Sequence, residues 1–388
     1  MSEFIPFALP LIGEDEINEV VSTLKSGWLT TGPQTRRFEN DFASFLRRDH
    51  AIAVNSATAG LHLALEAVGV GRGDVVVTTV YTFTATAEVI RYLDATPVFV
   101  DIDPVTKNLD INQLSEVVKM NAGRVKAIIP VHFAGLACEM DEIIKIGREC
   151  GAVIVEDAAH ALPTTYKGQL VGSFGDIAVF SFYATKTLAT GEGGMVVTNN
   201  ADWASRMKTM RLHGINRDVF DRYSSKKPSW YYEVVAPGFK YNMTDVAAAI
   251  GIHQLRKLNN MQRRRQEIAH IYLAEFSNLP FDLPFSPDSD VHAWHLFTIE
   301  LKLNQLSLDR DGFIAALVEA GVGASVHFIP LHRQPYWKVF GALNDSDFPV
   351  ATDKFLRTLS LPIYPAMSDD QIMRVVQAVK NICNQHAL

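Results

Sequence analysis

Lys186 stands among small and apolar residues in the stretch SFYATKTLATGEGG (181–194). Because a lysine is rarely fully buried without a partner, this position needs a chemical reason. Burial and nearby cations lower the pKa of a lysine ammonium, and the free amine can then form a Schiff base with a carbonyl cofactor. The residues alone leave one alternative open, a lysine with a buried stem and a charged head in solvent.

A second group of polar residues follows the apolar run in AVIVEDAAHA (152–161). Glu156 and Asp157 come at the end of this predicted strand, and His160 follows closely. A carboxylate placed here can keep the ring nitrogen of a cofactor protonated. Asp157 can instead cap a helix, and His160 can be a hydrogen-bonded, partly buried side chain.

A third candidate is NSATAGLHLALEAVG (55–69), where small residues open a predicted helix. The first N–H groups of a helix have no partner within it, and with the helix dipole they form a ready phosphate site. An ordinary Ser or Thr cap is the alternative. A lysine, an acid and a phosphate cradle together predict pyridoxal 5′-phosphate (PLP) as the cofactor. Lys186 then also moves protons as a general acid and base.

These candidates need a sheet to bring them together. Between about residues 50 and 200, short β-rich runs alternate with helical patterns, which is typical of a largely parallel α/β sheet covered on both faces. The runs are DVVVTTV (74–80), TPVFVDID (96–103), VKAIIPVHF (125–133), AVIVEDAA (152–159), DIAVFSF (176–182) and GGMVVTNN (193–200). Ligands of such sheets bind beyond the carboxyl ends of the strands, where all three candidates are expected.

The pattern changes after about residue 255, so we predict a large PLP-binding domain over 1–255 and a small C-terminal α+β domain over 256–388. The polar run KLNNMQRRRQE (257–267) indicates the start of a connecting helix. Strands are expected near HAWHLFTIEL, VGASVHF and LSLPIY, and helices near RDGFIAALVEAG and SDDQIMRVVQAVKNI.

Composition excludes several classes of protein. The chain has 388 residues and a net charge of −7, whereas a nucleic-acid binder usually has a basic excess. Its 3 cysteines lack the spacing of a disulfide framework or a zinc site, and we expect no metal. No secretion signal and no apolar run of transmembrane length is found in the sequence. We therefore expect a cytoplasmic protein with no membrane partner.

Ordered blocks along nearly the whole chain resemble the DegT/StrS-type nucleotide-sugar aminotransferases, which belong to the fold type I PLP enzymes. These blocks are SGWLTTGP (26–33), NSATAGLHLAL (55–65), YTFTATA (81–87), VEDAAHAL (155–162), SFYATKTLATGEGG (181–194), HGINRD (213–218), PGFKYNMTD (237–245) and VHFIPLHRQPY (326–336). The resemblance implies a seven-stranded, mostly parallel sheet in the large domain. It also implies a homodimer whose two active sites lie at the interface.

The resemblance also assigns roles to cofactor-binding residues. Lys186 matches the lysine that bonds to PLP, Asp157 the partner of the pyridine nitrogen, His160 the neighbour of the phenolic oxygen, Phe83 the ring that stacks on the pyridine, Thr58 and Ala59 the backbone phosphate binders, Ser181 a further phosphate ligand, and Asn242 a phosphate-site residue from the other subunit. Without the family, Phe83 would be a core residue and Asn242 a turn or capping residue.

The matched blocks also contain candidate substrate residues: Trp28, Thr30, Arg217, His327, His332 and Tyr336. Each of them can instead serve packing or the surface. Two departures from relatives bear on the substrate and leave the cofactor unaffected. Tyr183 replaces a histidine found in many relatives, and Phe83 stands where the most similar enzymes have Trp.

The blocks HAIAVNSATAG, KYNMTD and VHAWHLF are most similar to family members that make UDP-4-amino-4-deoxy-L-arabinose, and the whole chain also resembles perosamine and other 4-amino-sugar enzymes. The resemblance therefore implies transfer of an amino group from L-glutamate, which leaves as 2-oxoglutarate, to a 4-keto nucleotide-linked sugar. PLP alternates with pyridoxamine 5′-phosphate (PMP) during turnover. The products are amino sugars for polysaccharides, lipopolysaccharide among them.

Four alternatives are weighed against this function. Amination at C3 of the sugar stays open. A PLP-dependent sugar dehydratase is disfavoured because Lys186 is present, and a non-catalytic relative because Lys186 and Asp157 are both present. A nicotinamide-dependent sugar oxidoreductase or epimerase needs a GxGxxG block after an early strand, and the first hundred residues contain none.

Overall fold

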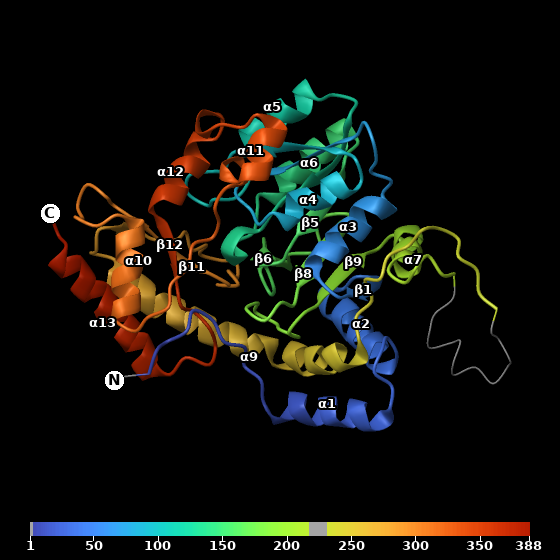
Figure 1. Cartoon of the computed structure of the whole chain (residues 1–388), viewed down its shortest axis with the longest axis horizontal. Coiled ribbons are helices and arrows are strands. Elements are labelled where there is room, and N and C mark those ends of the chain that lie inside the picture. Colours follow the sequence, from blue (N-terminus) through green and yellow to red (C-terminus); the bar gives the residue numbers. More distant parts are fainter. Residues whose placement is uncertain (1–2, 217–230) are drawn as a thin grey trace.

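A seven-stranded sheet forms the core of the larger part of the molecule (Figure 1), in the order β1-β9-β8-β5-β4-β2-β3. The strands are β1 (His50–Val54), β2 (Val75–Thr79), β3 (Thr96–Val100), β4 (Val125–Ile129), β5 (Val153–Asp157), β8 (Ile177–Ser181) and β9 (Gly194–Thr198). β9 runs antiparallel to both of its neighbours, and the other adjacent pairs are parallel. The predicted, mostly parallel α/β sheet is therefore confirmed. This computed structural model describes residues 3–216 and 231–388.

Helices cover both faces of this sheet, as its apolar strands require. One face carries α3 (Ala57–Ala67), α4 (Ala85–Tyr92) and α7 (Ala201–Met210), and the other carries α2 (Pro33–Leu46), α5 (Ile111–Met120), α6 (Met140–Cys150) and the first part of α9 (Asp245–Phe276). Alternation along β1 shows the two layers, because Ile52 and Val54 pack against the first face while Ala51 and Ala53 pack against the second. The result is a three-layer sandwich.

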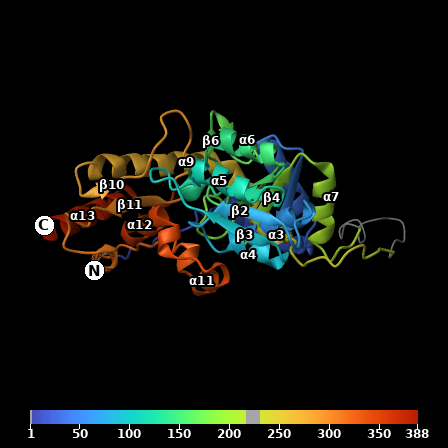
Figure 2. The ribbon, with the colours of Figure 1, turned by 90° about the horizontal axis from the view of Figure 1, so that it is seen from above.

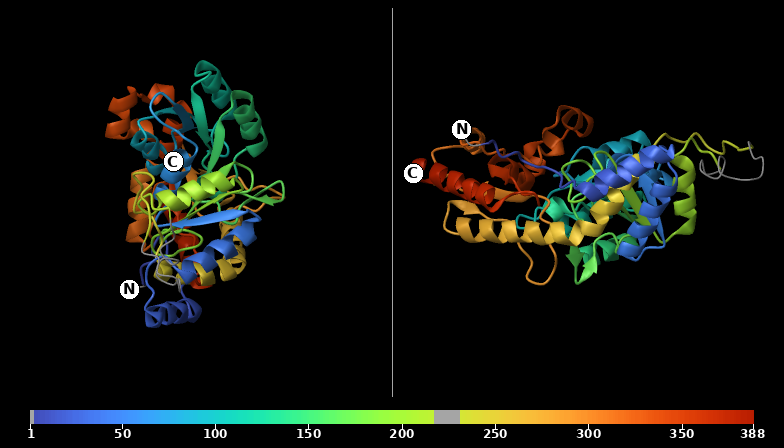
Figure 3. Two further views of the ribbon diagram at one scale, coloured as in Figure 1. Left: turned by 90° about the vertical axis from the view of Figure 1, so that its right-hand side faces the viewer. Right: turned by 90° about the horizontal axis from the view of Figure 1, so that it is seen from below.

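A smaller unit lies at the opposite end of the molecule from α7 (Figure 2). Its sheet is antiparallel, in the order β10 (Phe281–Asp282), β11 (Phe297–Leu301) and β12 (Thr358–Leu361). α10 (Arg310–Glu319), α13 (Asp369–Gln385) and the end of α9 pack on it. Ile5 joins the same core, so the N-terminal segment runs beside α13 (Figure 3).

The remaining elements connect these two parts. They are α1 (Glu14–Ser26), α11 (Pro335–Gly341), α12 (Pro349–Arg357), the short strands β6 (Thr165–Tyr166) and β7 (Gln169–Leu170), and the 3₁₀ turns η1 (Phe133–Gly135), η2 (Leu331–Arg333) and η3 (Asp345–Asp347). α1 lies against α9, held by an ion pair of Glu16 with Lys257 and a hydrogen bond between Glu19 and His253. Trp337 of α11 packs on Phe99 of β3. The smaller unit is thus fixed beside the carboxyl ends of the large sheet.

Two details differ from the sequence prediction. The connecting helix α9 begins at Asp245, ahead of the polar run, because Thr244 accepts the Ala247 N–H and caps it there. The expected strand VGASVHF (322–328) is wrong. Its backbone makes only single bridges, Val322 with Ile5 and Ser325 with Ser360, so no ladder forms.

The predicted domain boundary at 255 lies inside α9, which continues from the large sheet into the smaller unit.

Among residues 3–216 and 231–388, no helix combines the length and the apolar character needed to cross a membrane.

Candidate active site

A cavity of about 470 Å³ opens beyond the carboxyl ends of β2, β4, β5 and β8. Large-sheet residues supply most of its wall, namely Ser56, Ala57, Thr58, Leu61, Thr82, Phe83, Ala85, Thr86, Val131, Asp157, Ala159, His160, Ser181, Tyr183, Thr185, Lys186, Glu192 and Gly193, and the smaller unit adds His295, His327 and Phe328. This volume is typical of a small-molecule site. The structure therefore brings Thr58, Phe83, Asp157, His160, Ser181, Lys186 and His327 of the predicted set into one cavity.

Lys186 lies in the turn that follows β8, where its backbone N–H donates to the Tyr183 carbonyl at 2.9 Å. The residue is half-buried, because its side chain lines the open cavity. Its amine lies inside the cavity among the other lining residues. Nζ lies 3.5 Å from Nε2 of His295. Burial lowers the pKa of Lys186 to about 8, although the Asp157 carboxylate acts in the opposite direction. At pH 7 about a tenth of the amine is therefore unprotonated and nucleophilic, far more than for an ordinary lysine.

Asp157 ends β5 and is buried, and no helix of the described residues begins at its position. Its Oδ2 accepts the Thr86 hydroxyl at 2.8 Å, and its Oδ1 accepts the Ala159 N–H at 3.1 Å. Burial raises the pKa of Asp157, and these two hydrogen bonds and the Lys186 charge oppose that change. The carboxylate is thus held in a fixed orientation across the cavity from the amine.

His160 is buried in the loop after β5, between the two structural units. Its Nδ1 accepts the Ala134 N–H at 3.3 Å, so its proton belongs on Nε2. The ring stacks on Phe328 with centroids 5.7 Å apart and lies 4.4 Å from the His295 ring. Burial, with help from the Lys186 charge, lowers the pKa of His160 well below its usual range. The imidazole is a neutral hydrogen-bond donor.

The N-terminus of α3 supplies the anion-binding part of the wall. Ser56 caps the helix by accepting the Ala59 N–H at 3.1 Å, while Ala57 and Thr58 line the cavity. The helix begins close to β9, because a Cβ on Gly194 would lie only 2.8 Å from the Ala57 nitrogen. The backbone of this first turn has the helix dipole behind it, and Ser181 lines the same cavity, so this part of the wall fits a phosphate group.

Other predicted residues lie elsewhere. Ala59 is buried behind the wall, and Asn242 lines a separate cavity, where its amide donates to the Thr31 hydroxyl at 2.8 Å and its oxygen accepts Lys240 at 2.6 Å. His332 is buried against Phe348 and bonds to Thr352 at 2.9 Å, which is a packing role. Trp28 is half-buried and Thr30 is exposed away from this cavity, Tyr336 lines a neighbouring cavity, and Arg217 lies outside the described residues.

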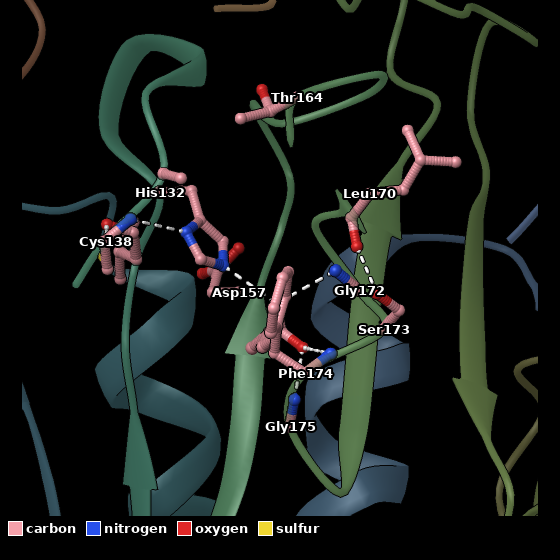
Figure 4. Close-up of polar contacts among 12 residues, drawn as sticks. His132, Cys138, Asp157, Thr164, Leu170, Gly172, Ser173, Phe174 and Gly175 are labelled. Carbon is pink, nitrogen blue, oxygen red and sulfur yellow. Dashed lines mark hydrogen bonds and ion pairs between the residues drawn. The ribbon is translucent and has the colours of Figure 1, made fainter. Parts of the chain in front are cut away.

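A buried polar cluster supports the strand that carries Asp157 (Figure 4). His132 Nδ1 accepts the Cys138 N–H at 3.1 Å, so the His132 proton is on Nε2, 3.2 Å from Glu156. Glu156 also accepts the N–H groups of Gly172 at 2.9 Å and Gly175 at 2.6 Å. The cluster therefore ties the ends of β4 and β5 to the loop before β8.

Two residues of the site were not found by sequence reasoning. Thr86 lies within the block YTFTATA, but nothing local indicates that it reaches Asp157, which is 71 positions away. His295 lies within VHAWHLF, which reads as an ordinary apolar strand start. An imidazole inside an apolar run was the only available signal.

Comparison with known proteins agrees with this geometry. The model of the DegT/DnrJ/EryC1/StrS aminotransferase family matches residues 10–380. The chain is 50% identical over 384 residues to an uncharacterized protein of Methanocaldococcus jannaschii, covering 99% of this chain and 98% of that protein. It is 48% identical over 383 residues to the spore coat polysaccharide biosynthesis protein SpsC of Bacillus subtilis, covering 98% and 97%.

Solved structures show the same similarity. A putative sugar aminotransferase of Streptococcus pneumoniae, solved in its PMP form, superposes with a TM-score of 0.92 at 32% identity and covers 98% of this chain and 99% of its own. Its PLP form gives a TM-score of 0.90 at the same identity and coverage.

Fold and site together define a fold type I aminotransferase. The chain belongs to the DegT/DnrJ/EryC1/StrS family, so the predicted family and enzyme class are confirmed. This family is PLP-dependent, and the cavity fits that cofactor, since a depressed-pKa amine, a buried carboxylate and a helix N-terminus converge on one space.

Proposed function

We propose that this enzyme binds PLP in the described cavity and transfers an amino group from L-glutamate to a 4-keto nucleotide-linked sugar, of the UDP-4-amino-4-deoxy-L-arabinose type or a related 4-amino sugar. The observation that carries the proposal is the placement of the Lys186 amine and the Asp157 carboxylate in one cavity, beyond the carboxyl ends of the neighbouring parallel strands β8 and β5. Membership of the family and the sequence blocks named above support the substrate class.

The bound cofactor supplies an aldehyde that carries the amino group and a ring that acts as an electron sink. Lys186 would hold the cofactor covalently through Nζ, and its free amine would serve as the general base and acid that moves a proton. Asp157 would keep a proton on the pyridine nitrogen. His160 would donate its Nε2 proton toward the phenolic oxygen, and Phe83, which is 59% exposed in the cavity wall, would cover the ring. The α3 N-terminus and Ser181 would bind the phosphate.

A second cavity of about 850 Å³ adjoins the first and supports a large substrate. Thr82, Phe83 and Phe328 line both cavities, so the two spaces share a wall of aromatic rings. Exposed Tyr92 and Tyr336 line the second cavity, and rings of this kind can stack on a nucleotide base. The reacting sugar would then lie by Lys186 while the nucleotide occupies the second space.

A homodimer with shared sites belongs to the same proposal. Asn242 lies off the Lys186 cavity, so in this reading it serves the phosphate site of the partner subunit. Apolar side chains on α1, including Ile17 and Leu24, are about half exposed in one chain and suit burial in such an interface.

The role of Lys186 is tested by Lys186→Ala. We expect loss of transfer by at least about 10³-fold, because both the covalent attachment and the proton carrier are removed. Borohydride reduction of the wild-type holoenzyme followed by peptide mass spectrometry should find the cofactor fixed on residue 186. The exposed Lys145→Ala serves as the matched control and should keep wild-type turnover. Full turnover by Lys186→Ala would end the proposal.

The substrate is tested by incubating the purified holoenzyme with L-glutamate and a panel of UDP-, GDP- and dTDP-ketosugars, with products identified by mass spectrometry and NMR. Amination of 4-ketosugars is expected. Amination of 3-ketosugars alone would show that C3 is aminated and that the proposed position, C4, is wrong. Amination of keto acids without any ketosugar would overturn the substrate class and leave the cofactor roles intact.

A further inference from the structure

His295 comes from the segment that leads into β11 of the smaller unit, yet it lines the cavity of the large sheet. Its side chain is only 6% exposed, and its Nε2 lies 3.5 Å from Lys186 Nζ. This separation is at the outer limit of a hydrogen bond, as is common for catalytic contacts before ligands bind.

His292, three positions earlier, provides a contrast. Its ring stacks on Trp294 at 3.9 Å, and its Nδ1 accepts the Trp294 N–H at 2.9 Å. His292 is thus accounted for by local packing. His295 is not, because its Nδ1 is buried without a hydrogen-bond partner in the described part of the chain.

The protonation of His295 follows from its surroundings. Burial lowers its pKa well below the usual range, and the neighbouring cations act in the same direction. Asp157, His160, His295 and His327 interact with the Lys186 charge, and Glu192 and Tyr183 line the same cavity. Burial also lowers the pKa of His327 to about 4. The three imidazoles are therefore neutral.

A neutral imidazole carries a single N–H proton, so the contact with Lys186 determines which ring nitrogen of His295 carries it. An ammonium at Lys186 can only donate, and Nε2 of His295 must then be the acceptor, with the His295 proton on Nδ1. Resting on the proposed role of Lys186, we infer that His295 is a positioning residue that accepts a hydrogen bond from the Lys186 ammonium and holds this amine toward the cofactor space. It keeps its own proton throughout.

The experiment measures the pKa of Lys186 in the apoprotein. Brief acetylation with trace acetic anhydride across a pH series, read by peptide mass spectrometry against a free-amine standard, gives this value directly. In His295→Leu the Lys186 ammonium loses its hydrogen-bond acceptor and is less stable. The Lys186 pKa should therefore fall by about one unit, a tenfold shift in the protonation equilibrium. His295→Gln retains an acceptor oxygen on a chain of similar length and should recover most of that shift.

His292→Leu is the matched control, because it removes a buried imidazole without a contact to Lys186, and the Lys186 pKa should stay at the wild-type value. Circular dichroism and thermal unfolding show whether each variant is folded. An unchanged or raised Lys186 pKa in a folded His295→Leu protein would overturn the inference. If that variant does not fold, a Lys186 pKa about one unit below the wild-type value in His295→Gln, which keeps an acceptor, would do the same. Borohydride trapping of the cofactor on another lysine would instead refute the proposed role of Lys186.

Discussion

Thr86 donates its hydroxyl proton to the Asp157 carboxylate at 2.8 Å and contacts the Thr82 hydroxyl at 2.9 Å. Together with the Ala159 N–H that Oδ1 accepts, this bond fixes the orientation of the Asp157 carboxylate. Thr86→Val keeps the shape of the side chain and removes this donor, so we expect about tenfold weaker cofactor binding, the usual effect of losing one hydrogen bond to a charged group. Equilibrium titration of the apoprotein with PLP measures the change. Thr86→Ser should bind as the wild type does, and equal affinity in Thr86→Val would show that the bond has no positioning role.

At the same scale, sequence reasoning found the residues that directly follow strands. Lys186, Asp157 and His160 were accessible to it because each lies within a few positions of a β-rich run, and the carboxyl ends of parallel strands meet. His295 was not accessible, since its contact with Lys186 joins positions 109 residues apart and depends on how two units pack.

At the scale of elements, Glu156 links β5 to the loop before β8. The side chain is fully buried and accepts bonds from Gly172, Gly175 and His132. Glu156→Gln replaces one acceptor oxygen by an NH₂ group that faces N–H donors, so we expect the free energy of unfolding at pH 7 to fall by about 2–4 kcal/mol. Urea denaturation measures the loss. The control is Glu142→Gln, because Glu142 is exposed and pairs only with Lys145 on the surface of α6 in the described residues. This change should alter the free energy of unfolding by less than about 0.5 kcal/mol.

The pH dependence of this loss has a definite sign. Burial alone would raise the pKa of Glu156, but the contacts from His132 and the two glycine N–H groups together lower it below the ordinary 4.5. A carboxylate with a lowered pKa stabilises the fold above its unfolded pKa, and this contribution disappears as the pH falls through the folded value. The gap between wild type and Glu156→Gln should therefore narrow below pH 4.5. A gap of constant size down to pH 3.5 would contradict the assignment.

The elements themselves were largely predictable where local pattern and burial agree. Each β-rich run of the large sheet contains a strand, because short runs of valine and isoleucine are typical of strands that are buried on both faces. The start of α9 was missed because the run after Thr244 is apolar and small, and only the cap marks it. VGASVHF has a strand composition, but its neighbours Ile5 and Ser360 each offer a single bridge, so pairing partners rather than propensity decide the outcome.

At the scale of the whole molecule, the smaller unit completes the site by placing His295, His327 and Phe328 over the ends of the large sheet. A buried ion cluster helps to hold it there, because Lys107 from the loop between β3 and α5 and Lys354 from α12 both bond to Glu300 of β11, at 2.6 and 2.7 Å. This closure was not predictable from local sequence. It depends on contacts between segments far apart in the chain, which only the family resemblance could indicate.

The proposed shared site makes a quantitative prediction for mixed dimers. If each site takes Lys186 from one subunit and Asn242 from the partner subunit, Lys186→Ala and Asn242→Leu homodimers are both impaired. A mixed dimer has one site with both changes and one site with neither. Unfolding and refolding equal amounts together should give about half mixed dimers and hence about a quarter of the wild-type activity. Tagging the two chains differently allows the mixed species to be isolated, with an expected half of wild-type activity.

The control for this experiment uses two residues that line the same cavity of one chain. Asp157→Asn and Lys186→Ala act in one cavity of one chain, so their mixed dimer has one lesion in each site and should stay inactive. Asn242 lies in a different cavity of its own chain, bonded to Thr31 and Lys240, which is why its rescue requires a second subunit. Absence of rescue in an isolated Lys186→Ala and Asn242→Leu mixed dimer would mean that Asn242 serves its own chain, and the shared-site proposal would fall.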